Sequence, residues 1–410
     1  MEQKGKRIIL ILACIGFVFL LPFFAHLENR ELPRPEVLRV SDYEQLLSNQ
    51  KETHVRNYLG HLLINGAPAP YDAGQNCYYV SESIDAKAFL AELSWSDQNV
   101  SVFFAPDPLW ENKAEAMKNN HPFTLIVSDG RTYHRQSVIF SGLPILTIQT
   151  ESEKSYVFDE GIPTGTLRVF EPSEDAYTVH TSLCTFHPRG NTTSRFDKTP
   201  LRICLYQANG EKNHLPLAGL RTDDDWILNS LYTDSSKIRD QVSVDLWNNI
   251  ADTNPEHDIQ GTHMAYVEVI IDGSYEGLFG LMEPIGKKST GLDPERDILY
   301  QAKSFLLREE DFLAARSGLE FFAIEIKTPD YWTGEAVWDP ITDFVDRFTW
   351  NTDSYSYEEL VEIMDLDNAI DHSLFLDATT ATDNFFHNTY YLAVLQENGR
   401  YRFTKIPWVD

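Results

Sequence analysis

The stretch 266–282, with the sequence YVEVIIDGSYEGLFGLM, consists of two apolar runs separated by Asp272 and Gly273. Asp-Gly pairs favour the tight turns that join antiparallel strands, because both central residues of such a turn adopt positive φ. The β-branched and aromatic residues on both sides of the pair favour extended strands. The stretch therefore predicts a β-hairpin with strands at 266–272 and 275–282.

A second hairpin is predicted at the C-terminal end of the chain. The apolar runs 389–395 and 401–406 flank Glu397, Asn398 and Gly399, which again favour a turn. Upstream of the first hairpin, the sequence predicts three further strands, at 165–170, 177–186 and 201–206.

Two helical regions accompany these strands. A helix is predicted over 236–251, with Asp234 or Ser235 as its cap. Its apolar residues recur on one face at helical spacing: Ile238, Val242 and Leu246. Residues 357–381 predict two helical segments, with Asp367 as a second cap. Grouped strands and helices predict an α+β fold for a domain over 153–410.

The region 61–152 has a different pattern of apolar and turn residues. Its short apolar stretches, such as 100–105 and 124–127, are divided by turn residues, which predicts a small β-sandwich-like module. The preceding region, 29–60, reads as a stalk followed by a short helix at 41–60 capped by Ser41. Neither region carries a pattern of residues typical of a catalytic site.

The N-terminus predicts a membrane anchor. Basic residues precede an apolar run at 8–25 that contains no charge. A cleaved signal peptide has a similar pattern, but the bulky residues at 22–24 argue against a cleavage site. We therefore predict an uncleaved single-pass anchor over 1–28. Because the basic flank stays in the cytoplasm, the rest of the chain is expected outside the cell membrane.

Charge and cysteine content narrow the possible functions. The net charge of −28 opposes nucleic-acid binding, and no basic block follows residue 7. The four cysteines form no CxxC pair, which argues against a zinc site. Cys184 and Cys204 lie on neighbouring predicted strands, so they could form a disulfide or could be buried as small apolar residues.

The segment 383–388, DNFFHN, has the residues of a phosphoryl-transfer loop. Asp383 and Asn388 have D-x-x-x-x-N spacing, and the second hairpin and Asp410 follow them. A carboxylate can accept the proton of a substrate hydroxyl, and an amide oxygen can bind Mg²⁺ without adding charge. A further acid is needed to hold the metal at the phosphates.

A candidate phosphate-binding group lies upstream. Arg189 and Gly190 stand in a polar loop between predicted strands, and Lys198 begins the next strand. Such a lysine can neutralise phosphate charge, although it can equally face solvent.

Several motifs in this order resemble the CotH kinase family. The segment RGNTT at 189–193 resembles the family's RGNSS-like motif, and Lys198 stands at its following lysine. The WILN segment at 226–229, followed by Asp234 and Arg239, resembles a second motif. The hairpin with Met282-Glu283-Pro284 and the final HN and IPW elements resemble the remaining ones. The resemblance covers about 155–410.

The resemblance implies an atypical kinase-like, two-lobed domain that uses ATP and Mg²⁺ to phosphorylate Ser/Thr-rich coat or surface proteins. Asp383 would be the catalytic base, Asn388 a metal ligand, and Lys198 and Arg189 would lie near the ATP phosphates. Glu283 would be structural or close to the nucleotide. Arg239 would contact phosphate or hold its helix by a salt bridge.

The chain departs from the family pattern at its end. Where the family has IPWD-x-D, this chain has Val409 and Asp410. Because a one-residue shift along a strand turns a side chain to the other face, Asp410 does not simply replace the missing acid as a metal ligand. Either the C-terminal part of the domain is incomplete, or the chain is a non-catalytic surface or spore-coat assembly protein. Carbohydrate processing by paired acids such as Glu276 and Glu283 lacks any sign of a sugar cleft.

Overall fold

The computed structural model describes residues 32–54, 60–85, 89–151, 164–173, 176–190, 193–253, 259–303, 324–330, 335–345, 347, 356–381, 384 and 387–408. Asp383, Val409 and Asp410 lie outside these ranges, as does most of the predicted anchor and stalk. Within the ranges, no helix combines the length and the apolar character that crossing a membrane requires.

The chain divides into two compact units. The first comprises Met1–Ile145, Phe170–Val179 and Gly273–Tyr275, and the second comprises Leu146–Val169, His180–Asp272 and Glu276–Asp410. The domain boundaries drawn from the sequence stay predictions, and each unit is described by itself.

The first unit is built on a seven-stranded sheet of order β1-β8-β9-β10-β6-β5, with β2 beside β10. Its strands are β1 (Glu36–Val37), β2 (Lys51–Glu52), β5 (Tyr71–Asp72), β6 (Cys77–Ser81), β8 (Ser101–Phe104), β9 (Pro122–Ser128) and β10 (Thr132–Ser141). A three-stranded sheet contains β4 (Ala67–Pro68), β3 (Leu62–Ile64) and β7 (Leu93–Trp95). The β-rich character predicted for this region is confirmed.

Aromatic side chains form the core beside this sheet. The ring of Trp110, from the turn η1 (Pro108–Glu111), stacks on Phe123 with centroids 4.0 Å apart. Phe104 and Phe140 meet the same indole edge-on. The short helix α3 (Lys113–Lys118) follows and buries Met117. These large rings explain how short strands obtain enough apolar contact to be stable.

The predicted helix at 41–60 is too long, and its cap is wrong. The helix α2 runs over Val40–Asn49, and the residue before it is Arg39. Gln50 is extended, and Lys51 and Glu52 then pair with Thr132 and Tyr133 of β10. Strand pairing with a distant segment therefore overrides the local helical signal after Asn49.

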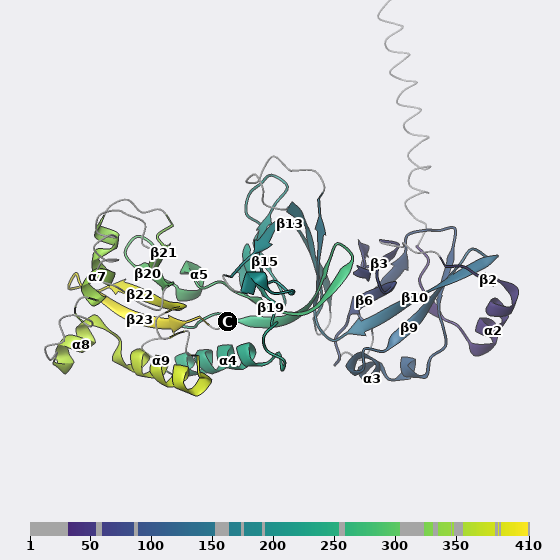
Figure 1. Cartoon of the computed structure of the whole chain (residues 1–410). Helices are drawn as coiled ribbons and strands as arrows, with labels where there is room; N and C mark the ends of the chain where they lie inside the picture. The colour runs from purple at the N-terminus through teal and green to yellow at the C-terminus, as the bar shows by residue number, and fades with distance from the viewer. Residues whose placement is uncertain are drawn as a thin grey trace, which may run out of the picture. The chain divides into compact units, whose positions relative to one another are not determined.

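A closed barrel forms the N-terminal part of the second unit (Figure 1). In order around the barrel, its strands are β11 (Ile145–Thr150), β12 (Thr164–Pro172), β13 (Tyr177–Pro188), β14 (Leu201–Tyr206), β17 (Asp225–Asn229), β19 (Ser274–Met282) and β18 (Met264–Ile271). Alternate residues of these strands fill the interior, as Ile203 and Leu205 do on β14. The strands predicted at 165–170, 177–186 and 201–206 are confirmed.

The first predicted hairpin is confirmed as β18 and β19. Asp272 and Gly273 both have positive φ, 49° and 75°, as the tight turn requires. The Asp272 carboxylate also accepts hydrogen bonds from the backbone N–H and the hydroxyl of Thr150, at 2.7 Å each. The turn therefore ties the hairpin to β11 as well as reversing the chain.

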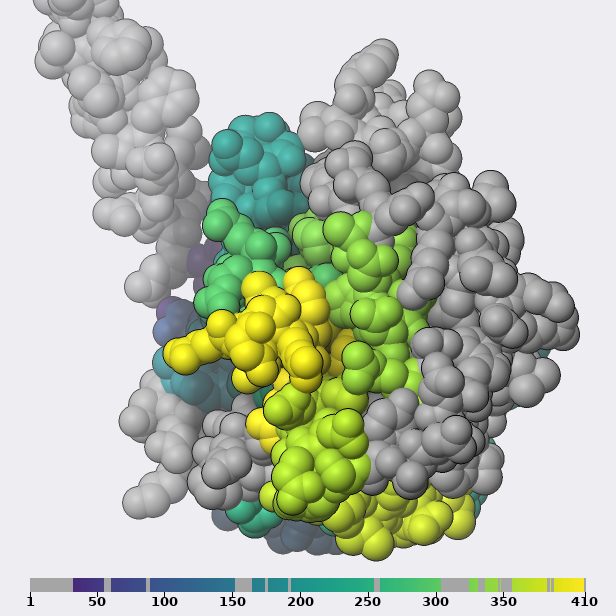
Figure 2. Space-filling model, turned by 90° about the vertical axis from the view of Figure 1, so that its left-hand side faces the viewer, coloured from purple at the N-terminus to yellow at the C-terminus, as the bar shows by residue number. Residues whose placement is uncertain are grey.

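The C-terminal part of the second unit is a four-stranded sheet with helices around it (Figure 1). The sheet order is β21 (Ile324–Thr328), β20 (Ile298–Ala302), β22 (Thr389–Leu395) and β23 (Tyr401–Pro407). The helices are α4 (Arg239–Asp252), α5 (Lys287–Thr290), α7 (Asp339–Val345), α8 (Tyr357–Ile363) and α9 (Leu366–Thr379). The second predicted hairpin is confirmed as β22 and β23. The yellow C-terminal segment that contains it reaches the surface near the centre of Figure 2.

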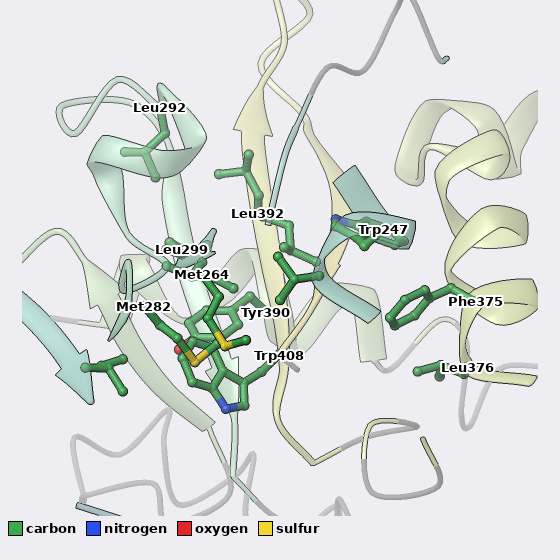
Figure 3. Packing of buried hydrophobic residues seen from close by; sticks show 14 of the residues in the cluster. Trp247, Met264, Met282, Leu292, Leu299, Phe375, Leu376, Tyr390, Leu392 and Trp408 are labelled. Atoms are coloured by element: carbon green, nitrogen blue, oxygen red, sulfur yellow. The ribbon is translucent and has the colours of Figure 1, made fainter. Parts of the chain in front are cut away.

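One apolar cluster joins the barrel to the C-terminal part. Figure 3 shows Met264 and Met282 from the barrel hairpin gathered with Tyr390 and Trp408 from the C-terminal hairpin. Trp247 of α4 and Phe375 of α9 extend the same cluster, and their ring centroids are 5.5 Å apart. This shared core fixes the barrel loops relative to the C-terminal hairpin.

The helix caps differ from prediction. The cap of α9 is Asp365, whose carboxylate accepts from the N–H of Asn368, and Asp367 lies in the first turn. The helix α4 begins at Arg239, three residues later than predicted, because Asp234 accepts the N–H groups of Ser236 and Arg239 before the helix starts.

The apolar stripe that the sequence places on one face of α4 faces solvent. The side chains that α4 buries are Val244, Trp247, Asn248 and Ala251. Ile238, Val242 and Leu246 remain 55%, 56% and 36% exposed. The helical spacing was predicted correctly, but the inward face is the one that carries the large indole of Trp247.

Cys184 and Cys204 are free thiols on the paired strands β13 and β14. Burial raises their pKa, to about 12 for Cys184 and about 11 for Cys204, and the carboxylate of Asp225 adds to the second shift. Cys184 therefore fits the alternative of a small buried residue, whereas Cys204 is only partly buried.

Candidate functional site

Arg189 connects the barrel with the C-terminal hairpin. It follows β13, and its N–H donates to the carbonyl of Pro200 at 2.9 Å. Its guanidinium carbon lies 5.0 Å from the centroid of the Trp408 ring, within the range of a cation–π contact. The N–H of Trp408 in turn donates to the carbonyl of Asn388 at 2.9 Å. Two candidate residues that are 199 positions apart in sequence are thus neighbours of one tryptophan.

Backbone hydrogen bonds hold the loop around Asn388 in place. Asn388 has a φ of 60°, and its N–H donates to the carbonyl of Ala302 on β20 at 2.9 Å. The side-chain amide of Asn384 donates to the carbonyl of Trp408, and the hydroxyl of Thr389 donates to the carbonyl of Asn384 at 2.6 Å. The half-buried side chain of Asn388 has no hydrogen-bond partner among the described residues, so its amide oxygen is available to a ligand.

Lys198 lies in the loop before β14, close to the barrel hairpin. The prediction that Lys198 begins this strand is wrong, because β14 starts at Leu201. Its ammonium group donates to the carbonyl of Leu278 and lies 4.0 Å from the centroid of the Phe279 ring. Gly277 has a φ of 84°, and a Cβ added at this position would lie 4.0 Å from Nζ of Lys198, at an ordinary contact distance. Burial and the charge of Lys237 together lower the pKa of Lys198 to about 8, against the opposing effect of Glu276.

Glu283 is buried in an ion-pair network at the end of the barrel hairpin. Its carboxylate accepts from the backbone N–H of Arg221 at 2.7 Å, from the Arg221 guanidinium at 3.3 Å and from Nδ1 of His263 at 3.1 Å. Although burial opposes ionisation, the hydrogen bonds and the positive charges of His263 and Arg221 lower the pKa of Glu283 below its usual value. Glu283 therefore links Arg221 and His263 in one ion-pair network.

A pocket of about 380 Å³ opens beside this network. Its lining is Gly219, Leu220, Arg221, Gln260, Gly261, His263, Glu283, Lys288 and Ser289. Sequence reasoning found Glu283 but missed Arg221 and His263, which stand in no motif and reach the carboxylate only through the folding of separate loops.

Arg239 does not join the other candidate residues. Its side chain is 81% exposed, and its Nε lies 3.7 Å from the Asp234 carboxylate. Hydrogen bonds from the N–H of Arg239 and from Ser236 lower the pKa of Asp234 to about 2. Of the two roles open from the sequence, the salt bridge at the helix start is the one that the structure displays.

A cluster of metal-ligand type adjoins the Glu283 network, since Arg221 contacts acids of both. Ligand atoms of His214, Asp223 and Asp224 lie within 4.8 Å of one another. However, the Lys288 ammonium already donates to both carboxylates, and Arg221 pairs with Asp223. Because these cations compensate the acids, the cluster is an ion-pair network that holds α5 to the barrel.

Asp383 and Asp410, the predicted base and metal ligand, lie outside the described residues. Among the described residues next to them in sequence, Asn384 donates its side-chain amide to the carbonyl of Trp408.

Comparison with known proteins gave one family. The family model described as CotH kinase protein matches residues 186–408, more than half of the chain and the whole span from the Arg189 loop to Trp408. No curated protein matches the sequence.

Proposed function

Because the chain belongs to the CotH kinase protein family, we propose that it is an ATP- and Mg²⁺-dependent Ser/Thr protein kinase. Its substrates would be coat or surface proteins. The apolar run at 8–25 supports the further proposal that an N-terminal anchor holds the kinase domain on the outer side of the cell membrane.

The observation that carries the proposal is the meeting of Arg189, Trp408 and Asn388. A phosphoryl group in transfer is highly anionic, so its site needs fixed cations and a metal-binding oxygen close together. Arg189 provides a guanidinium, and Asn388 provides an amide oxygen on a loop held by four backbone or side-chain hydrogen bonds.

The described residues fit a nucleotide and a hard metal ion. Lys198 has an ammonium group that can pair with phosphate, and Asn388 has the oxygen donor that Mg²⁺ prefers. ATP would supply the phosphoryl group, with Mg²⁺ offsetting its charge. In this proposal Asp383 accepts the proton of the substrate hydroxyl, and Arg189 and Lys198 hold the phosphates in line.

Label transfer tests the proposal directly. We expect the full chain, incubated with γ-labelled ATP, Mg²⁺ and a Ser/Thr-rich surface protein, to label that protein on serine or threonine. Chelation of the metal should remove the label. A chain that transfers no label while still binding ATP would contradict the kinase proposal.

The pKa of Lys198 predicts how ATP affinity depends on pH. The ammonium is charged below its pKa of about 8 and loses its charge as the pH rises through that value. Between pH 7 and pH 9, the protonated fraction falls roughly tenfold, so the Kd for Mg²⁺-ATP should rise by up to about tenfold. Titration calorimetry at both pH values measures this.

The matched control for this effect is Lys198→Arg, because a guanidinium stays charged at both pH values. Its Kd should be nearly independent of pH. If the wild-type chain and the variant show the same pH dependence, Lys198 does not contact the phosphates.

A second candidate function is a non-catalytic assembly or binding protein at the surface. It is favoured by Val409, which stands where the family has the acid that holds the metal. Thermal unfolding with and without Mg²⁺-ATP separates the two functions, because a ligand that binds the native state raises the unfolding temperature. No rise at saturating nucleotide would support the assembly function.

A further inference from the structure

Two helices of the second unit present apolar side chains to solvent. On α4 these are Ile238, at its cap, and Val242 and Leu246, and on α9 they are Ile370 and Leu374, 57% and 60% exposed. The spacing is four residues within each helix, so each set forms one stripe along its helix. Both stripes lie opposite the buried residues, which are Trp247 and its neighbours on α4 and Phe375 and its neighbours on α9.

The two stripes belong to one surface. Trp247 of α4 contacts Phe375 and His372 of α9, with ring centroids 5.5 Å and 6.0 Å apart. Figure 1 shows the two helices next to each other along the lower edge of the second unit. In that view both helices lie below the strands β19, β22 and β23, and their buried faces contribute to the same apolar cluster, so their exposed faces point away from it on the same side. We name this surface the α4–α9 face.

The apolar side chains of the α4–α9 face contribute little to the buried core, because each is at least 36% exposed. Single exposed apolar residues are common, but two parallel stripes on adjoining helices are typical of a protein-binding surface. Residues repeated every four positions are also the contacts through which helices pack against another helix. The pattern therefore favours a helical partner.

The charges around the stripes define that partner further. The two helices carry six acids: Asp240, Asp245, Asp252, Asp367, Asp371 and Asp377. Arg239 is the one cationic residue in their sequences, and it pairs with Asp234. The neighbouring Asp367 and Asp365 help to raise the pKa of Asp371, in addition to its partial burial. A second copy of this chain would place like charges opposite one another, which opposes self-association.

We propose that the α4–α9 face binds an amphipathic helix of a partner protein, with aliphatic residues on one side and lysines or arginines flanking them. The aliphatic residues would cover Val242, Leu246, Ile370 and Leu374, and the basic residues would pair with the acids at the edges. This binding site is separate from the proposed phosphoryl-transfer site and does not depend on catalysis.

The test uses the full chain and a labelled helical peptide of about 18 residues, or five turns, with leucine on one side and lysine on the other. Fluorescence anisotropy should show saturable binding that weakens between about 0.05 M and about 0.5 M salt. The double variant Val242→Gln/Leu374→Gln should weaken it by about tenfold or more. Asp245→Asn/Asp371→Asn should reduce the salt dependence.

Tyr357→Gln is the matched control, because Tyr357 is a 68% exposed apolar residue of α8, outside this face. It should bind the peptide as the wild type does. A second peptide with glutamate in place of lysine should not bind. The thermal unfolding temperature should be unchanged in every variant, because all the substituted side chains except Asp371 are largely exposed.

Three results would overturn the proposal. The first is equal affinity of the wild type and the Val242→Gln/Leu374→Gln variant for the basic peptide. The second is equal binding of the acidic peptide. The third is concentration-dependent dimerisation of the full chain that the same double variant abolishes, which would assign the face to a second copy.

Discussion

Replacement of Asp383 by asparagine is expected to reduce phosphate transfer by about 10²–10⁴-fold, the usual contribution of a general base. Asparagine keeps the size of the side chain but cannot accept the proton of a substrate hydroxyl. The affinity for Mg²⁺-ATP should change much less than the rate, because the proposed base contacts the substrate and not the nucleotide. Single-turnover labelling together with ATP titration measures both quantities.

The matched control for Asp383→Asn is Glu397→Gln, which removes an exposed acid from the turn of the same C-terminal hairpin. This variant should label the substrate at the wild-type rate. Equal labelling by Asp383→Asn and the wild type would remove Asp383 from the proposed chemistry and leave the family membership untouched.

Replacement of Glu283 by glutamine is expected to lower the free energy of unfolding by about 3–5 kcal/mol. The carboxylate is 4% exposed, and its loss leaves the positive charge of Arg221 less well compensated, together with a broken hydrogen bond to His263. Urea-induced unfolding of the second unit measures this change in the free energy of unfolding. Glu276→Gln, an exposed acid on the same hairpin, should change the same free energy by no more than about 0.5 kcal/mol.

The same ion pair predicts the direction of a pH effect. The pKa of Glu283 is lowered in the folded state. Its contribution to the free energy of unfolding is therefore present above about pH 4.5 and is lost as the pH falls through the folded pKa. The pKa of His263 is raised by its hydrogen bond to Glu283, so its contribution is present below about pH 6.5 and is lost as the pH rises. The pair should therefore stabilise the folded state most between these two pH values. In the His263→Gln variant, the free energy of unfolding should fall less as the pH rises above about 6.5.

Local signals explain which parts of the fold the sequence could predict. Asp272 and Gly273 define their turn without help from the rest of the chain, so the hairpin was predictable. The closure of the barrel was not, because it depends on pairing between β11 and β18, which are far apart in sequence. The helix α4 carries apolar residues on two opposite faces, so periodicity alone could not tell which face is buried.

In the candidate site, too, some features could be predicted from short stretches of sequence and others could not. The motifs around Arg189, Lys198 and Asn388 could be read as short runs of residues. The sequence could not show that Arg189 stacks on Trp408 or that Trp408 is hydrogen-bonded to the backbone of Asn388. These contacts depend on the three-dimensional fold. Arg221 and His263 had no local signal at all, because each contributes a single side chain to a carboxylate that lies on another element.

The closing contact of the barrel has a consequence for biosynthesis. The N–H of Asp272 donates to the carbonyl of Ile148, so one edge of β11 has its partner only after more than one hundred further residues are made. At about 5–20 residues per second, that delay is roughly 6–25 s. During this time the unpaired edge can pair with other chains. A chaperone that shields extended segments should therefore increase the yield of the folded protein more than slower expression alone.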